Sequence, residues 1–258
     1  MAKTEFTMDG SLGIFTLTDA PLNLIGMEMI DEFEEFLTTY EQYNIRAMIL
    51  QAEGDMFSAG VNVDDVFKGR SRSEAIKMLE RFNLQLHRFE NLPFPTLAVV
   101  QGDCLTAGLE MALACDMAWV SDTANLGLVE AVIGTTPMGG GTQRIAQRAG
   151  AVRAAEIVMG AGFYKAETFE KWNIINRVLP KEVLLDKALR FAKRLANGPT
   201  LAHRATKTLI LESVNNGIDE ADKILPEVAA PLFESEDMKH GIESLTTQGP
   251  GKADFQGK

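Results

Sequence analysis

One strand–turn–helix unit, residues 95–116, constrains the fold of this chain more than any other stretch. The unit begins with an apolar, β-branched run, Pro95–Val100, at two prolines, and this run predicts a short buried strand. Gly102 and Gly108 are expected to bracket a turn, and the helix formers from Ala107 onward are apolar on nearly every side, which is typical of an interior helix. Glu110 is expected in the first turn of this helix. A carboxyl group so close to the core is costly unless it is paired or used. The same turn presents free backbone N–H groups, so the unit predicts an anion cradle beside an acid, as acyl chemistry needs.

The composition is that of an ordinary α/β protein, 258 residues long and 46% hydrophobic, and it limits the possible functions. No run of about eighteen apolar residues is present, so we expect no membrane span. Met1–Gly10 lacks the apolar core of a secretory signal, so the expected location is cytoplasmic. A net charge of −11 argues against a surface for nucleic acid or anionic membranes. Cys104 and Cys115 form no CxxC pair and have no histidine at ligand spacing, so we expect reduced structural thiols and no metal site.

Hydrophobic periodicity predicts strands alternating with helices up to about residue 180. Ser73 is the expected N-cap of one helix, and Asn173 suits a left-handed position at the end of another. Gly54 and Gly60 mark sharp turns in a strand-to-loop segment. The expected strands cover 4–18 (a hairpin around residues 9 and 10), 47–50, 95–100, 117–120 and 174–179, and the main expected helices cover 29–40, 73–90, 107 onward and 139–148.

From Lys181 onward the pattern changes to helix after helix, with no strand signal. Asn197–Pro199 is the best boundary, because Gly and Pro together end one helix and begin another. We therefore divide the chain into an α/β part that carries the site, residues 1–197, and an all-helical part, residues 198–258. The segment Gly249–Lys252 is turn-like and is expected to be mobile.

Three segments carry candidate chemistry: Phe57–Asn62, Thr106–Glu110 and Glu130–Arg144. In this order and at these separations they resemble the crotonase (enoyl-CoA hydratase/isomerase) superfamily, and the resemblance extends over nearly the whole chain. It implies an α/β fold, a spiral of ββα units with an all-helical C-terminal trimerisation region, assembled as a homotrimer or as a homohexamer of two trimers. It also implies an acyl-coenzyme A thioester as substrate and no separate cofactor, because coenzyme A is part of the substrate.

The resemblance further implies an oxyanion hole made from the backbone N–H groups of Val61 and Ala107. Charge moves onto the thioester oxygen as an enolate forms, and losing one preorganised donor typically costs about 3 kcal/mol. Side-chain identity matters little for such a donor, so these residues can serve although the family more often has Ala and Gly there. The substrate-binding residues expected around the donors are Ser58, Gly60, Asn62, Val63, Gly108, Met138 and Gly139.

In the hydratases of the family two glutamates flank the Cα and Cβ of the substrate, and Glu110 and Glu130 fill both positions here. Adding water to an α,β-unsaturated thioester needs a base for the water and a proton source for Cα. Two carboxyls in a dry pocket resist ionising together, and their titration belongs to the pair, so their division of roles stays open. The resemblance therefore favours hydration of trans-2-enoyl-CoA to a 3-hydroxyacyl-CoA.

Other functions remain open, because the oxyanion hole is common to the superfamily. A double-bond isomerase needs only one well-placed base, and decarboxylases or hydrolases use the same donors. A non-catalytic acyl-CoA-binding protein is a further alternative, which two costly carboxyls disfavour. Two residues depart from the family pattern. Asn62 stands where Asp is usual, although an amide can still hold the turn. Met138 replaces a small residue, which narrows the acyl pocket or changes how water is held.

Simpler explanations also exist for several of these residues. Glu110 could stabilise a helix N-terminus, and Glu130 could be a solvated loop acid. Gly139–Gly141 lacks the Lys-Ser/Thr pair of a P-loop, which favours a tight turn into a helix. Ser58 lacks the first glycine of a nucleophile elbow. The basic loop formed by Lys68, Arg70 and Arg72 either reaches coenzyme phosphates or is solvated. The histidines are expected at surface or packing positions; they are His87, His203 and His240.

Overall fold

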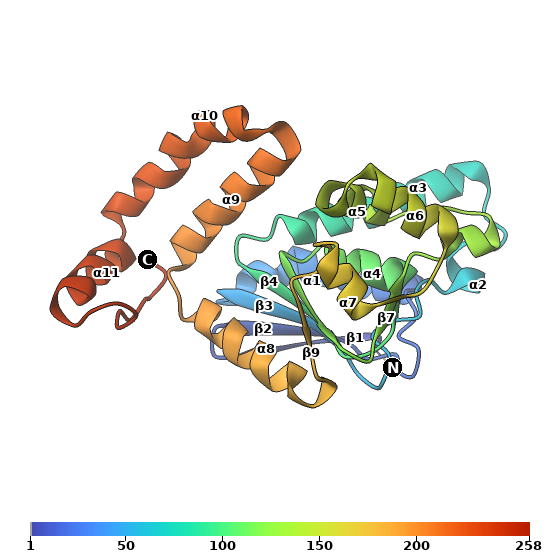
Figure 1. Ribbon diagram of the computed structural model, residues 1–258, viewed down its shortest axis with the longest axis horizontal. Coiled ribbons are helices and arrows are strands. Elements are labelled where there is room, and N and C mark those ends of the chain that lie inside the picture. Colours follow the sequence, from blue (N-terminus) through green and yellow to red (C-terminus); the bar gives the residue numbers. More distant parts are fainter. Residues whose placement is uncertain (1) are drawn as a thin grey trace.

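The computed structural model describes residues 2–258 and is built around a six-stranded mixed sheet (Figure 1). Strands β1 (Thr4–Asp9) and β2 (Leu12–Leu17) form an antiparallel hairpin whose turn contains Gly10 at a φ of +64°. All further neighbours pair in parallel, so each pair needs a long crossover. The order is β1-β2-β3-β4-β6-β9, with β3 at Ala47–Ala52, β4 at Thr96–Val100, β6 at Met117–Ser121 and β9 at Arg177–Leu179.

A second, smaller sheet takes one short strand from successive turns of the chain. Its order is β5-β7-β8, with β5 at Cys104–Leu105, β7 at Asn125–Gly127 and β8 at Tyr164–Lys165. Isolated parallel bridges from Ser58 to Cys104 and from Ile25 to Val61 continue this ladder toward the N-terminus. Each repeat of the chain therefore adds a strand or bridge to both sheets and then a helix. This is the predicted spiral of ββα units.

The inner core lies between the main sheet and helices α1 (Met27–Thr39), α3 (Arg72–Glu90) and α4 (Thr106–Leu113). Phe15, Phe33 and Phe89 are almost completely buried here, with centroid distances of 5.6 Å for Phe15–Phe33 and 5.3 Å for Phe33–Phe89. Burying one such ring stabilises a fold by about 3 kcal/mol. The helical spacing of apolar residues in α1 and α3 is thus explained by contact with this core.

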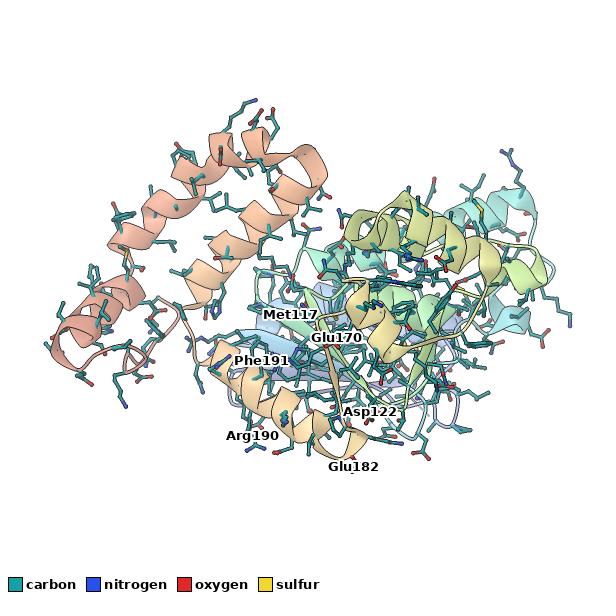
Figure 2. The ribbon with its side chains drawn as sticks, in the orientation of Figure 1. Met117, Asp122, Glu170, Glu182, Arg190 and Phe191 are labelled. Atoms are coloured by element: carbon teal, nitrogen blue, oxygen red, sulfur yellow. The ribbon has the colours of Figure 1, made fainter. Side chains whose placement is uncertain are left out.

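The outer core covers the other face of the sheet, under helix α8 (Lys181–Ala196). Along β3, Met48 packs into the inner core while Ala47 and Ile49 pack into the outer one, as alternation along a strand requires. Phe191 of α8 and Met117 of β6, both labelled in Figure 2, pack against this outer core. Strands buried on both faces are apolar throughout, so the sequence shows them as continuous runs.

The remaining helices lie beside the sheets or beyond them. Those in the α/β part are η1 (Tyr40–Gln42), α2 (Val63–Val66), η2 (Glu130–Ile133), α5 (Gly141–Ala149), α6 (Ala151–Gly160) and α7 (Ala166–Lys171). A C-terminal arm of α9 (Thr200–Asn216), α10 (Ile218–Ala229), η3 (Ala230–Glu234) and α11 (Glu236–Thr247) extends away from the sheets (Figure 1). It starts next to the predicted boundary at residues 197–199, and the division into two domains stays a prediction.

The end of the chain returns to the start of this arm, where a buried arginine holds it. Arg46 donates hydrogen bonds to the carbonyls of Gly198 (2.6 Å) and Phe255 (3.0 Å). Asp237 accepts two backbone N–H groups from the residues after Phe255, at 2.7 and 2.9 Å. The last residues are thus bound, and the mobility of Gly249–Lys252 stays a prediction.

Three local predictions are wrong. Ser71, not Ser73, caps α3, because its hydroxyl and the glutamate three residues later form a reciprocal capping box. Helix α4 begins at Thr106, one residue early, so Gly108 lies inside the helix and does not bracket the turn, and Glu110 lies in the second helical turn. The strand expected at 174–179 is shortened to the three residues of β9.

Among residues 2–258, no helix is both long and apolar enough to cross a bilayer. The cytoplasmic location stays a prediction. Cys104 and Cys115 are free and buried, and burial raises the pKa of both thiols, so neither is suited to nucleophilic or redox chemistry.

Candidate active site

Glu110 projects from α4 into a buried cradle of backbone amides. Its side chain is almost completely buried, and its Oε1 accepts the N–H groups of Gly139 at 2.7 Å and Gly141 at 2.8 Å. A Cβ at position 139 would lie 2.9 Å from Glu110 Oε2, and one at position 141 would lie 2.9 Å from Glu110 Cγ. The two glycines therefore allow the loop to approach the carboxylate closely. The glycine run at 139–141 does turn into helix α5, as expected, and it also binds this acid.

Glu130 reaches the same place from the first residue of η2, after β7. Its residue is 7% exposed, and within residues 2–258 its buried Oε2 has no hydrogen-bond partner. Together Glu110, Glu130, Val61 and Met138 line one cavity of about 20 Å³. The structure thus brings together residues from three distant predicted segments, and it excludes the interpretation of Glu130 as a solvated loop acid.

The two carboxyls differ in what stabilises their charge. Burial raises the pKa of Glu110, and the amides of Gly141 and Gly139 and the charge of Arg144 oppose that rise. Burial is the main cause that raises the pKa of Glu130 to about 7, and the neighbouring charge of Glu110 contributes to the same rise. Two donors bind the Glu110 carboxylate, while no donor in the described part of the chain binds Glu130 Oε2. Glu110 is therefore better suited to carry the negative charge and Glu130 to carry the proton.

The two predicted oxyanion donors lie on neighbouring segments, Val61 on the loop before α2 and Ala107 at the start of α4. Val61 follows Gly60, whose φ is +100°, and Ala107 follows Thr106, whose φ is +48°. A Cβ on Gly60 would lie 1.6 Å from Thr106 Oγ1, so only glycine fits against this neighbour. In the described part of the chain, neither Val61 nor Ala107 donates its backbone N–H to another group. Both amides are therefore available for a ligand oxygen, and their role stays a prediction.

Thr106 is a feature that the sequence did not reveal. A β-branched residue at positive φ is rare and costs on the order of 1–3 kcal/mol, and such strain gathers at functional sites. Its Oγ1 is buried, with no hydrogen-bond partner among residues 2–258. No local pattern could have marked it, because threonine is among the residues least expected in this conformation.

The other predicted substrate-binding residues take different positions. Ser58 is fully buried: its hydroxyl donates to the Asn23 carbonyl (2.7 Å) and accepts the Gly60 N–H (3.0 Å). It packs against Gly108, where a Cβ would lie 2.4 Å from its own. Ser58 thus supports the loop from behind, and the same burial excludes it as a nucleophile. Asn62 caps α2 through the N–H of Asp65, so the amide does hold this turn, while Val63 begins α2 and is exposed.

Arg144, on α5, ties the glycine loop to helix α3. Its guanidinium binds both carboxylate oxygens of Glu90, at 2.9 and 3.0 Å, and donates to the Gly139 carbonyl at 2.7 Å. Gly139 in turn donates to Glu110. No sequence pattern indicated this contact, because Glu90 and Arg144 are 54 positions apart.

The remaining candidates lie away from this chemistry. Lys68 pairs with Asp64 on the surface, and Arg70 donates to the carbonyls of Val66 and Asp65, so both side chains serve the α2 loop. The three histidines lie on α3, α9 and α11. No group of three His, Cys, Asp or Glu side chains in residues 2–258 is arranged to hold a metal ion.

Comparison with known proteins places this geometry in a family. The family model for enoyl-CoA hydratase/isomerase matches residues 7–257. An enoyl-CoA isomerase/hydratase of Mycosarcoma maydis is 31% identical over 214 residues, which cover 83% of this chain and 77% of that protein. A probable enoyl-CoA hydratase of Bacillus subtilis (strain 168) is 25% identical over 260 residues and 100% of both chains. The crystal structure of an enoyl-CoA hydratase from Bacillus anthracis has a TM-score of 0.92 at 22% identity, covering 99% of this chain and 100% of that one.

The two-sheet spiral with its helical C-terminal region is thus confirmed as the fold of the crotonase superfamily. More narrowly, the chain belongs to the enoyl-CoA hydratase/isomerase family. Enzymes of this class act on enoyl-CoA, and hydratase and isomerase names both occur among the relatives.

The raised pKa of Glu130 gives a first prediction. Carboxyl ¹³C NMR is expected to show Glu130 titrating near pH 7, and Glu110→Gln is expected to lower that pKa, because it removes the neighbouring charge. The fold favours the protonated form, so the free energy of unfolding should fall as pH rises from 4.5 to about 7, and Glu130→Gln should flatten this dependence. Glu156→Gln, at an exposed ion pair, is the control. A pKa near 4.5 for Glu130 would contradict the dry environment described here.

The Arg144–Glu90 pair gives a second prediction. Arg144→Met is expected to lower the free energy of unfolding by about 3 kcal/mol, because it leaves the Glu90 carboxylate and the Gly139 carbonyl without their partner. Chemical denaturation measures this change. The double variant Arg144→Met/Glu90→Met should recover part of the loss. The control Arg153→Met, at an exposed pair, should cost less than about 1 kcal/mol. Equal losses of unfolding free energy for Arg144→Met and Arg153→Met would show that the Arg144–Glu90 pair does not stabilise the glycine loop.

Proposed function

We propose that this protein hydrates trans-2-enoyl-CoA thioesters to 3-hydroxyacyl-CoA. The observation that supports this most strongly is the shared cavity of Glu110 and Glu130, two buried carboxyls whose surroundings favour different protonation states. Hydration needs a base and an acid at adjacent carbons, so it uses both groups. The relatives named as hydratases agree with this choice.

In the proposed mechanism the thioester oxygen accepts the N–H groups of Val61 and Ala107. These donors are fixed before the reaction begins, so they stabilise the negative charge that develops on this oxygen. Glu110, held as a carboxylate by Gly139 and Gly141, takes a proton from water while the water oxygen bonds to Cβ. Glu130 then gives its proton to Cα, and the enolate collapses to the 3-hydroxyacyl thioester. A pKa of about 7 lets Glu130 hold this proton at neutral pH and release it readily.

The second candidate is a double-bond isomerase, which the name of the Mycosarcoma maydis relative also supports. Isomerisation moves one proton between two carbons, so Glu130 alone could carry it, and the cradle around Glu110 would have no chemical use. Decarboxylation and thioester hydrolysis share the oxyanion donors, but they do not require a carboxyl pair. For these reasons hydration remains the preferred function.

Kinetics of two variants test this proposal. Glu110→Gln and Glu130→Gln should each lower kcat for crotonyl-CoA hydration by at least about 100-fold, because each removes one proton-transfer group. Loss of absorbance at the enoyl-thioester band measures the rate, and Glu156→Gln serves as the exposed control. If Glu110→Gln is inactive while Glu130→Gln hydrates normally, the scheme with two carboxyls is wrong. No turnover by the unaltered protein on any enoyl-CoA would favour a non-catalytic binding protein.

We also propose that the C-terminal arm joins copies of this chain into a trimer, or into two stacked trimers. Its helices expose large apolar side chains that a lone chain would leave in water. They are Ile210, Val214, Ile218, Leu225, Phe233, Ile242 and Leu245.

Light scattering should give a mass three or six times that of one chain. Ile218→Glu and Leu245→Glu should lower that mass, because each places a charge among the apolar contacts. Leu84→Glu, at an exposed apolar position of α3, should leave it unchanged. A monomeric mass for the unaltered protein at micromolar concentration would refute this assembly.

A further inference from the structure

The cavity that holds the two carboxyls is small. Its volume of about 20 Å³ compares with the roughly 10–15 Å³ that one water molecule needs by the same measure. Beyond Glu110 and Glu130 its walls are almost entirely apolar and include Phe67, Phe82 and Met138. There is space for little more than one water molecule, so only a short acyl group is expected to enter, and the lining offers little to bind a polar acyl substituent.

The wall behind this cavity is closed by tight packing. A Cβ on Gly139 would lie 2.7 Å from Leu86 and 2.8 Å from Phe82, so the glycine loop already touches α3. Both of these α3 side chains are buried, and Asn83 donates a hydrogen bond to the carbonyl of Met138. An acyl chain cannot pass between the loop and α3 unless it displaces these groups.

Helix α3 is itself fastened to its neighbours. Arg81 forms ion pairs with Asp31 and Glu34 of α1, and Glu90 binds Arg144 of α5. The capping box at Ser71 fixes its first turn. Helices α1 and α3, which both line the cavity, are therefore joined by polar contacts outside it, and α3 is also tied to α5, which opposes widening of the pocket.

We propose that this chain takes short acyl groups, of about four to six carbons, and that Met138 and Phe82 form the stop at the end of the chain. The proposal rests on the proposed function, because it assumes that the thioester carbonyl lies at Val61 and Ala107. With C1 there and Cβ between the carboxyls, the chain beyond Cβ is expected to meet these two side chains, which line the same small cavity. Hydrocarbon contact would favour an unsubstituted tail over a hydroxylated or charged one.

Chain-length series measure this limit directly. In a pocket with room to spare, each added CH₂ strengthens binding roughly fourfold. Calorimetry with saturated butyryl-, hexanoyl-, octanoyl- and decanoyl-CoA should instead show no gain beyond six carbons, and at least a tenfold loss at ten. The kcat/KM for the matching 2-enoyl-CoA compounds should fall in the same order. A steady gain in affinity up to ten carbons would overturn the proposal.

Variants at the proposed stop distinguish a limit on acyl-chain length from a general effect on folding. Met138→Ala should strengthen octanoyl-CoA relative to butyryl-CoA by about tenfold, and Met138→Leu, which keeps the volume, should preserve the original order. Met159→Ala, at a residue that is 79% exposed on α6, is the matched control. If Met138→Ala does not fold, Phe82→Ala removes the other half of the proposed stop, on α3. An unchanged order in whichever alanine variant folds would overturn the assignment of the stop.

The results also distinguish this inference from the proposed reaction. Short-chain binding without any hydration would refute the hydratase and leave the size limit standing. Hydration that is fastest with ten or more carbons would refute the size limit and leave the hydratase standing. Failure to bind any acyl-CoA would overturn both.

Discussion

The arrangement of the site depends on the hydrogen bonds from Gly139 and Gly141 to the carboxylate of Glu110. A buried carboxylate needs donors, and backbone amides can supply them only if the loop approaches without side chains in between. That approach brings the same loop against Phe82 and Leu86 of α3. One electrostatic requirement, the solvation of a single acid, thereby also sets the size of the cavity in front of it.

At the predicted oxyanion donors, the backbone residues that position the two N–H groups have positive φ angles. The spiral places the loop before α2 against the loop before α4, with bridges at Val61 and Ser58 extending the small sheet between them. Gly60 takes its positive φ without cost, whereas Thr106 takes it at a cost that the packing around α4 must offset. The inner core supplies that offset, since most of α4 is buried on all sides. A deeply buried helix is thus a physical condition for presenting the Ala107 amide in this orientation.

The fold could largely be predicted because its signals are local. Buried parallel strands are continuous apolar runs, the surface helices show regular apolar spacing, and Asn173 does adopt the left-handed conformation expected of it, at a φ of +61°. The helix start at Ser71 was missed by two residues, because two serines compete for the cap and only the reciprocal contact with Glu74 decides between them. In the site, the acid pair could be named from the order of three segments. The pairing of Arg144 with Glu90 and the strain at Thr106 could not, because both arise from contacts between distant segments.

The outer core has a consequence for the order of events as the chain is made. Its apolar face is built from strands β2, β3, β4 and β6, but its cover is α8, which comes after all of them. Until residue 196 has left the ribosome, that side of the sheet can meet only water or a chaperone. The nascent chain therefore carries an uncovered sheet face while residues 122–196 are made, and α8 then covers the assembled strands.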